Sequence, residues 1–190
     1  MGPAMVFHHP FYTLWIFWGI YWYATSTGTK RTVYTAQSRG RFIALVVIII
    51  LIIKGNDGSL PWLTHHLYET SRPLEFLGLI LCASGIAFAI WARNILGTNW
   101  SAQPTLKEGH ELIITGPYRY VRHPIYTGLL LAIFGTVIAS GRVLDFIILA
   151  YILIDTHFKA KIEESLMLRQ FPDTYPAYQQ RTKAIIPFVL

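Results

Sequence analysis

Long apolar segments separated by polar loops limit the folds that this chain can adopt. They occur at residues 7–24, 42–53, 74–92, 124–140 and 143–157. A transmembrane helix needs about 20 mostly apolar residues, so the segment at 42–53 requires a few flanking residues to cross a bilayer. Hydrophobic residues make up 53% of the chain and charged residues only 14%, fewer than in soluble domains. The pattern predicts an all-α integral membrane protein with about five transmembrane helices.

Turn residues predict where the later helices begin and end. Pro124 suits the first turn of its helix, where a missing N–H costs nothing. The turn Ser140-Gly141-Arg142 is so short that the helices on either side should be antiparallel neighbours. The fifth helix should continue past the membrane to about Gln170, where Phe171-Pro172-Asp173 stops it. We expect one domain over residues 1–190, with three spans in 1–92 and two in 93–190.

Basic residues are distributed unevenly between the loops. Of the 16 Lys and Arg residues, 13 lie in the loops 25–41, 93–123 and 158–190, and the others are Lys54, Arg72 and Arg142. The positive-inside rule therefore predicts that these three loops and the C-terminus are cytoplasmic and that the N-terminus lies on the opposite side. No basic run alternates with aromatic residues as in a nucleic-acid surface, so we expect the bilayer, and no nucleic acid, as a partner.

The longest polar interval is GTNWSAQPTLKEGHELIITGPYRYVRHPIY, residues 97–126. His123 should cap the helix that Pro124 starts, and the N–H groups of a helix N-terminus can hold an anion. Tyr126 lies one turn further and should line the same pocket. The alternative is a basic interfacial anchor before an ordinary helix. That alternative suits Arg119 and Arg122 singly, but it explains the density of His, Tyr and Pro at one helix start less well.

Lys159 and Glu163 are four residues apart and should share one face of the fifth helix. They could form a solvated ion pair. Alternatively, the carboxylate could bind a cationic ligand group while the neighbouring cation holds a substrate anion, and the spacing leaves both readings open. The chain has no Gly-rich nucleotide-binding motif and no Cys–His metal spacing, so we expect no metal site.

Several short motifs resemble the isoprenylcysteine carboxyl methyltransferase family of integral membrane methyltransferases. They are GTNWS, GPY, RHPxYxG, and Glu163-Glu164 followed by FxxxY, and the resemblance covers about residues 93–188. It implies a methyltransferase core in residues 93–190, with S-adenosyl-L-methionine as the cofactor. Matched position by position, it implies that the cofactor contacts Gln103, His110, Glu111, Leu112, Ile113, Tyr118, His123, Pro124, Ile125, Tyr126 and Glu163.

The resemblance also bears on the methyl acceptor. Lys159 stands where the family has an arginine thought to meet the substrate carboxylate, and we assign Arg122 to the substrate with it. A lysine keeps the charge but loses the planar bidentate fork. The implied function is methylation of a lipophilic small molecule or lipidated substrate, on a carboxylate. A carboxylate is already ionised at neutral pH, so no residue is expected to act as a general base.

Three other functions remain possible. Relatives of the family methylate amino groups of phospholipids, and they would differ from our expectation in the acceptor alone. Membrane sterol and ene reductases have a related C-terminal half but bind NADPH, and they lack the Glu-Glu pair followed by this spacing. A non-enzymatic membrane scaffold would require the polar cluster to have arisen without a function. The identity of the acceptor does not follow from the sequence.

Overall fold

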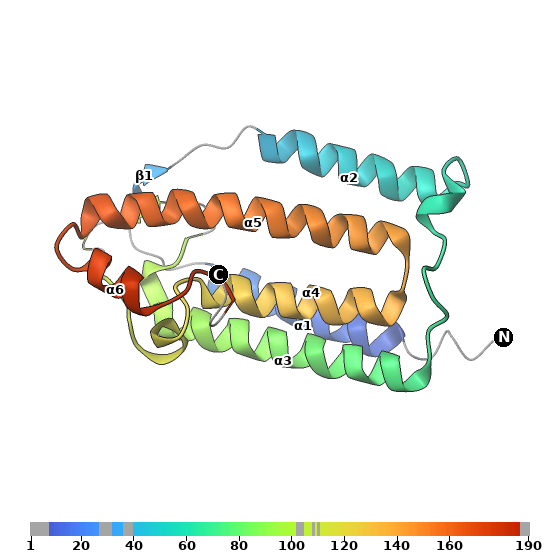
Figure 1. Cartoon of the computed structure of the whole chain (residues 1–190), viewed down its shortest axis with the longest axis horizontal. Coiled ribbons are helices and arrows are strands. Elements are labelled where there is room, and N and C mark those ends of the chain that lie inside the picture. The colour runs from blue at the N-terminus through green and yellow to red at the C-terminus, as the bar shows by residue number, and fades with distance from the viewer. Residues whose placement is uncertain are drawn as a thin grey trace.

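The computed structural model describes residues 8–26, 32–35, 40–101, 105–107, 109 and 111–186. Five long helices are aligned lengthwise in one bundle, with α2 and α5 drawn above α1, α3 and α4 (Figure 1). The helices are α1 (His8–Thr25), α2 (Gly40–Asn56), α3 (Arg72–Leu96), α4 (Pro124–Ser140), α5 (Val143–Gln170) and the short α6 (Tyr175–Arg181). Single 3-10 turns are η2 (Pro61–Leu63), η3 (Gly97–Asn99) and η4 (Gly116–Arg119).

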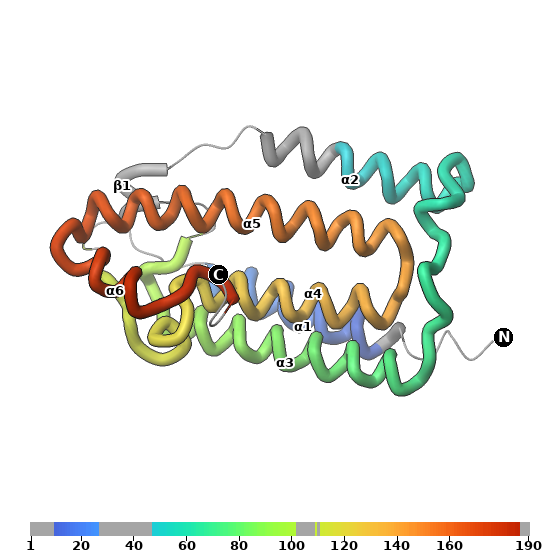
Figure 2. The backbone as a smooth tube through the Cα atoms, in the orientation of Figure 1, coloured from blue at the N-terminus to red at the C-terminus, as the bar shows by residue number. Residues whose placement is uncertain are grey.

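The predicted helix ends agree closely with the structure for α4 and α5. Pro124 occupies the first turn of α4, with His123 at the N-cap. Gly141 ends α4 in the left-handed region, with φ of 67°, and its N–H donates to the carbonyl of Val137. The chain then reverses sharply into α5, as the tube in Figure 2 shows. This turn makes α4 and α5 the antiparallel neighbours that the sequence predicted.

Two pairs of glycines hold α3 and α4 close together. A Cβ on Gly78 would lie 2.4 Å from the carbonyl oxygen of Gly135, and one on Gly85 would lie 2.4 Å from that of Gly128. The two contacts run in opposite directions along the helices, so α3 and α4 are antiparallel. Small residues such as Gly78 and Gly85 let helix backbones approach in this way within membranes.

A short β-ribbon departs from the all-α prediction. β1 (Thr32–Thr35) pairs antiparallel with β2 (Thr105–Lys107), with Thr35 opposite Thr105. Both strands lie in segments that the hydropathy pattern assigns to loops. The sequence TVYT of β1 is rich in β-branched and aromatic residues, which favour extended backbone. The ribbon therefore ties the loop between α1 and α2 to the polar stretch after α3.

The prediction of five membrane spans is supported only in part. Among the described residues, Arg72–Asn99 is the one helical stretch both long and apolar enough to cross a membrane, while Val47–Asn56 and Pro124–Ser140 are apolar but shorter. Large apolar side chains nevertheless face outward on the long helices, including Ile16 and Ile20 on α1 and Phe76 on α3. Such an exposed apolar surface indicates contact with lipid or protein.

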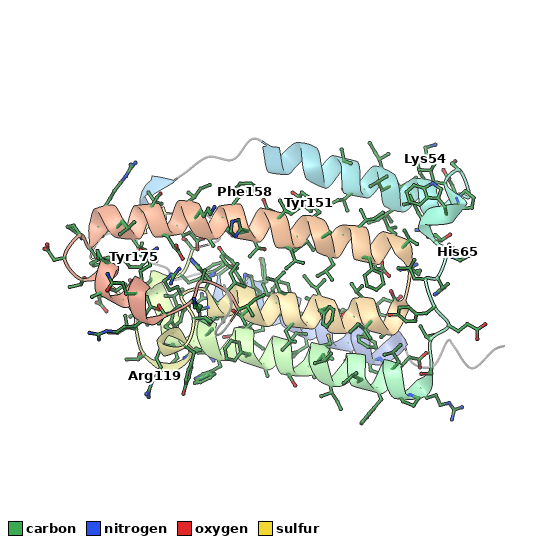
Figure 3. The ribbon with its side chains drawn as sticks, viewed as in Figure 1. Lys54, His65, Arg119, Tyr151, Phe158 and Tyr175 are labelled. Atoms are coloured by element: carbon green, nitrogen blue, oxygen red, sulfur yellow. The ribbon has the colours of Figure 1, made fainter. Side chains whose placement is uncertain are left out.

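The two ends of the bundle carry different features. Lys54 and His65 lie at one end, whereas Arg119 and Tyr175 lie at the other (Figure 3). The α4–α5 turn lies at the same end of the bundle as His65, because the N–H of Val143 donates to the His65 carbonyl at 3.0 Å. The start of α4 and the last turns of α5 lie at the other end, beside α6 (Figure 1).

Candidate functional site

A cavity of about 300 Å³ lies where the start of α4 meets the second half of α5. This volume is at the lower end of the usual range for small-molecule sites, roughly 300–1,000 Å³. Its walls come from α1, the segment after α3, the start of α4, α5 and α6. The lining residues are Trp18, Trp22, Leu96, Asn99, Trp100, Ser101, Glu111, Leu112, Ile113, Tyr118, Arg122, His123, Ile125, Tyr126, Leu129, Lys159, Glu163, Met167, Tyr175 and Tyr178.

The start of α4 is held by the chain that follows α6. The N–H of Arg122 donates to the carbonyl of Lys183 at 2.8 Å, and the N–H of His123 donates to that of Ala184 at 2.9 Å. Pro124, the next residue, has no N–H to satisfy and is fully buried. The segment after α6 thus fixes the direction in which α4 leaves the loop.

His123 lies between two carboxylates of α5. Its Nδ1 is 3.2 Å from Oε2 of Glu163, and its Nε2 is 3.3 Å from Oε1 of Glu164. The hydroxyl of Tyr126 donates to Oε1 of Glu163 at 2.5 Å, and the rings of His123 and Tyr126 stack with centroids 5.4 Å apart. The start of α4 and the cytoplasmic end predicted for α5 are therefore joined by one polar network.

The network favours charged forms of its members. Burial alone would lower the pKa of His123, but hydrogen bonds and the charges of Glu163 and Glu164 outweigh it and raise the pKa. Burial likewise opposes ionisation of Glu163, yet the hydrogen bonds from His123 and Tyr126 bring its pKa below the ordinary value. The pKa of Glu164 falls to about 2, because His123 and Arg122 together overcome the effect of burial. The site thus places His123 between two carboxylates that favour its protonated form.

Arg122 braces this network from the side of α6. Its Nε donates to Oε1 of Glu164 at 2.7 Å, and its Nη1 donates to the carbonyls of Gln179 and Thr182. Its side chain is 10% exposed and that of Glu164 is 13% exposed, so the ion pair is nearly buried. Arg122 also lines the cavity. The assignment of Arg122 to the substrate stays a prediction, since these hydrogen bonds join its side chain to other groups of the protein.

Lys159 lies against the ring of Tyr126, with Nζ 5.1 Å from the ring centroid. Its charge also lowers the pKa of Glu163, after the larger effects of burial, His123 and Tyr126. Lys159 and Glu163 both line the cavity and do not lie on an outer, solvated face. Of the two readings that the spacing left open, the geometry favours the one in which both groups face a ligand.

The loop before α4 supplies the rest of the predicted set. Glu111, Leu112 and Ile113 line the cavity with Tyr118, which is 6% exposed and whose carbonyl accepts a hydrogen bond from Tyr178 at 2.6 Å. Burial raises the pKa of Tyr118, so this phenol stays neutral. Gln103 and His110 were also predicted here, but they lie outside the described residues.

Most predicted residues that the structure describes therefore meet at one cavity. Ile125, Tyr126 and Glu163 line it, whereas Pro124 is fully buried and is not among the lining residues. Pro124 is correctly placed at the start of α4, and its contribution is to the backbone direction.

Sequence reasoning missed an aromatic wall on the other side of the cavity. Trp18 and Trp22 lie one turn apart on α1 with ring centroids at 5.1 Å, and Trp22 meets Trp100 edge to face at 5.4 Å. The four-residue spacing of the two tryptophans on α1 could have indicated a shared face. Their pairing with Trp100 could not have been found, because nothing in the sequence specifies how α1 packs against the segment after α3.

Comparisons with known proteins bear on the family and the fold of this chain. A family model described as phospholipid methyltransferase matches residues 74–174. A protein-S-isoprenylcysteine O-methyltransferase from Tribolium castaneum is 33% identical over 121 residues, which cover 61% of this chain and 42% of that protein. A solved structure of the eukaryotic intramembrane Ras methyltransferase, isoprenylcysteine carboxyl methyltransferase, superposes with a TM-score of 0.55 at 28% identity, covering 81% of this chain and 54% of that one.

These matches confirm the family resemblance that the motifs predicted. The chain spans about half the length of these two relatives.

Proposed function

The chain belongs to the phospholipid methyltransferase family, and on this premise we propose that it transfers a methyl group from S-adenosyl-L-methionine to the carboxylate of a lipophilic acceptor at a membrane. One observation carries the proposal. The predicted cofactor residues Tyr126 and Glu163 converge with His123 on one cavity, although α4 and α5 contribute them separately.

The chemistry of these residues fits the cofactor. Its amino acid portion carries an ammonium and a carboxylate. Glu163 is ionised and oriented by His123 and Tyr126, and a carboxylate has enough lone pairs to accept further hydrogen bonds from an ammonium group. The positive N-terminus of α4 favours the cofactor carboxylate. The apolar lining residues Ile113, Ile125 and Leu129 suit the less polar remainder.

The proposed reaction requires mainly position and shielding from the protein. The cofactor supplies a methyl group already activated on a sulfonium. A carboxylate acceptor is ionised at neutral pH and needs no general base. The chain's own residues hold the reacting groups in line and keep water out through the apolar walls of the cavity. Lys159 would hold the acceptor carboxylate near Tyr126, and a single ammonium would do so without the bidentate geometry of an arginine.

The membrane arrangement belongs to the same proposal. The outward apolar side chains of the long helices support lipid contact, and the acceptor would enter sideways from the bilayer. The distribution of Lys and Arg supports five spans, with the cavity and the C-terminus in the cytoplasm and the N-terminus opposite. The acceptor would be a lipophilic small molecule or a lipidated substrate.

A second candidate acceptor is an amine. The family model is described by phospholipid methylation, which is transfer to an amino group. Two carboxylates at the cavity end of α5 would tolerate a cationic acceptor. Lys159 opposes this candidate, because a second cation beside Tyr126 would repel an ammonium. The product of the reaction distinguishes the two candidates.

Ligand binding tests the choice of cofactor. We expect S-adenosyl-L-homocysteine to bind the detergent-purified protein saturably in calorimetry, and NADPH not to bind. Glu163→Gln should weaken that binding about 10- to 100-fold, the loss expected for a hydrogen bond to a charged group. Glu69→Gln, an exposed site outside the cavity, serves as the matched control. Saturable NADPH binding without S-adenosyl-L-homocysteine binding would instead support a reductase.

A further inference from the structure

Two segments at the site end of the bundle carry basic residues and no acidic ones. Residues 112–124 lead into α4, and residues 174–190 contain α6 and the chain after it, and neither range contains an Asp or a Glu. The two segments are joined, because the N–H of Arg122 donates to the carbonyl of Lys183 at 2.8 Å. Together they form one region of positive charge.

Three cations of this region are available to a partner. Arg119, Arg181 and Lys183 are exposed, and none of them forms an ion pair with another described residue. Arg122 differs, because it is nearly buried and paired within the protein. Figure 3 shows Arg119 at the outer edge of this end of the bundle, and its guanidinium carbon lies 5.7 Å from the centre of the Tyr120 ring. The region therefore offers unneutralised charge to an anion.

Large apolar side chains are exposed beside these cations. Ile114, Tyr120 and Ile186 all belong to the same two segments and are exposed. A surface that mixes cations with aliphatic and aromatic side chains suits the boundary between lipid headgroups and acyl chains. A nucleic acid or a free phosphate would match the charges but leave the aliphatic side chains in water. We call this set the basic surface, and it comprises Arg119, Arg181, Lys183, Ile114, Tyr120 and Ile186.

The basic surface continues the outward apolar face of α3. The turn η4, which precedes Tyr120, rests on the last turn of α3, since a Cβ on Gly116 would lie 3.2 Å from Cγ1 of Ile95. Ile80, Trp91 and Ile95 are exposed and share one face of α3 by helical spacing. Among the described helices, α3 is the one both long and apolar enough to cross a membrane. The basic surface therefore lies where α3 would leave the bilayer, at the level of the headgroups.

The same segments form part of the candidate site on their inner side. Tyr118 and His123 line the cavity, whereas Arg119 and Tyr120, which lie between them in the sequence, are exposed. The N–H of His123 donates to the carbonyl of Ala184 at 2.9 Å, so the chain after α6 also holds the start of α4. A contact on the outer side would restrain the backbone that positions His123.

We propose that the basic surface binds the headgroups of anionic phospholipids, and that this contact steadies the start of α4 and strengthens cofactor binding. The inference rests on the membrane arrangement and the cofactor proposed above, and it adds a lipid partner to them. Arginine and lysine donate charge-assisted hydrogen bonds to phosphate oxygens, while the exposed aliphatic and aromatic side chains contact the acyl chains. Each cation near an anionic surface adds to the attraction.

Titration of the detergent-purified full chain with short-chain lipids tests the contact directly. We expect dioctanoyl-phosphatidylglycerol to bind saturably in thermophoresis, and dioctanoyl-phosphatidylcholine to bind at least about tenfold more weakly because it has no net charge. Arg119→Gln and Lys183→Gln should each weaken binding of the anionic lipid about fivefold, and together about 25-fold. The Tm without added lipid should stay unchanged, because both side chains are exposed.

Arg169→Gln is the matched control, because it removes an exposed cation from the last turn of α5, outside the basic surface. It should leave the affinity for the anionic lipid close to that of the wild type. Equal binding of the two lipids, an equal loss in Arg169→Gln, or an unchanged affinity in the double variant would overturn the assignment. Competition by inorganic phosphate at the concentration of the lipid would also overturn it, since the site would then bind any free anion.

The affinity for S-adenosyl-L-homocysteine tests the link to the candidate site. In nanodiscs that contain phosphatidylglycerol and phosphatidylcholine in equal parts, the wild type should bind this ligand about fivefold more tightly than in phosphatidylcholine alone. The Arg119→Gln/Lys183→Gln variant should bind it equally in both. Equal affinities in the wild type would overturn the link to α4. Absence of binding in every lipid would contradict the proposed cofactor instead, and the lipid titration would still decide whether the basic surface binds headgroups.

Discussion

Nδ1 of His123, at the N-cap of α4, lies 3.2 Å from Oε2 of Glu163 on α5. The contact joins two segments that are far apart in the sequence, and it orients the carboxylate proposed to bind the cofactor. Tyr126 orients the same carboxylate from the next turn of α4. Geometry of this kind is what a positioning mechanism requires, because small displacements of the reacting groups lower the rate strongly.

Lys159→Ala should impair use of the acceptor more than binding of the cofactor. The ammonium faces the cavity beside Tyr126, so its loss removes the proposed partner of the acceptor carboxylate. We expect KM for a lipophilic carboxylate to rise about tenfold or more, as for a lost charged hydrogen bond. Affinity for S-adenosyl-L-homocysteine should change little. Lys161→Ala, an exposed site on the same helix, is the control. Equal losses in acceptor and cofactor binding would remove the role proposed for Lys159.

Arg122→Met should destabilise the protein by about 3 kcal/mol, because it leaves the nearly buried Glu164 without its closest cationic partner. Adding Glu164→Gln should restore part of the loss in a double-mutant cycle. Arg142→Met provides the comparison, since Arg142 is 41% exposed in its pair with Asp145 and should lose about 1 kcal/mol or less. Thermal denaturation in detergent measures the wild type, Arg122→Met, Glu164→Gln, the double variant and Arg142→Met. Similar effects at Arg122 and Arg142 would show that the buried pair adds no stability.

The pH dependence of stability should report on His123. Its pKa is raised in the folded state, so its contribution is complete below the unfolded value of 6.5 and disappears as pH rises through the folded value. Glu164 acts at the other extreme, where its contribution falls as pH drops from 4.5 towards about 2. The difference in Tm between wild type and His123→Gln should therefore shrink from about pH 6 to about pH 9. A difference that stays constant over this range would mean that folding does not raise the pKa of His123.

Gly85→Ala should destabilise the contact between α3 and α4. The new Cβ would lie 2.4 Å from the carbonyl oxygen of Gly128 and 2.5 Å from the N of Ala132, and neither backbone atom can move easily. We expect a loss of about 1–3 kcal/mol, as for other overpacked sites. Gly19→Ala on α1 meets no atom within 4 Å and should be neutral or slightly stabilising. Thermal denaturation should rank the two variants in that order, and the reverse order would contradict the close packing of α3 and α4.

Local signals in the sequence predicted much of the fold. Pro124 and Gly141 act within a few residues of themselves, so the bounds of α4 follow from backbone chemistry alone. The end of α5 at Phe171 follows in the same way. The pairing of β1 with β2 did not follow, since it depends on where two loops meet in space. The hydropathy pattern describes each segment separately and cannot predict which two loops will pair as strands.

In the candidate site, too, local motifs were predictive and contacts that depend on three-dimensional packing were not. The family motifs placed Tyr126 and Glu163 in one pocket, and the geometry of the cavity is consistent with that. The role of Glu164 was not foreseen, because its ion pair with Arg122 depends on the packing of α5 against the start of α4 and the segment after α6. Trp18 was missed because α1 carries no motif, and its position at the cavity is set by packing alone.

Methyl ester formation is the most direct measurement of the central claim. The full chain, purified in detergent, would be incubated with S-adenosyl-L-methionine labelled on its methyl group and with a lipophilic carboxylate, thiol or amine in parallel. We predict a labelled product from the carboxylate that releases methanol in mild base, together with S-adenosyl-L-homocysteine, and neither product when the chain is omitted. A base-stable product from the amine, or no transfer to any acceptor by a protein that binds S-adenosyl-L-homocysteine, would contradict the account.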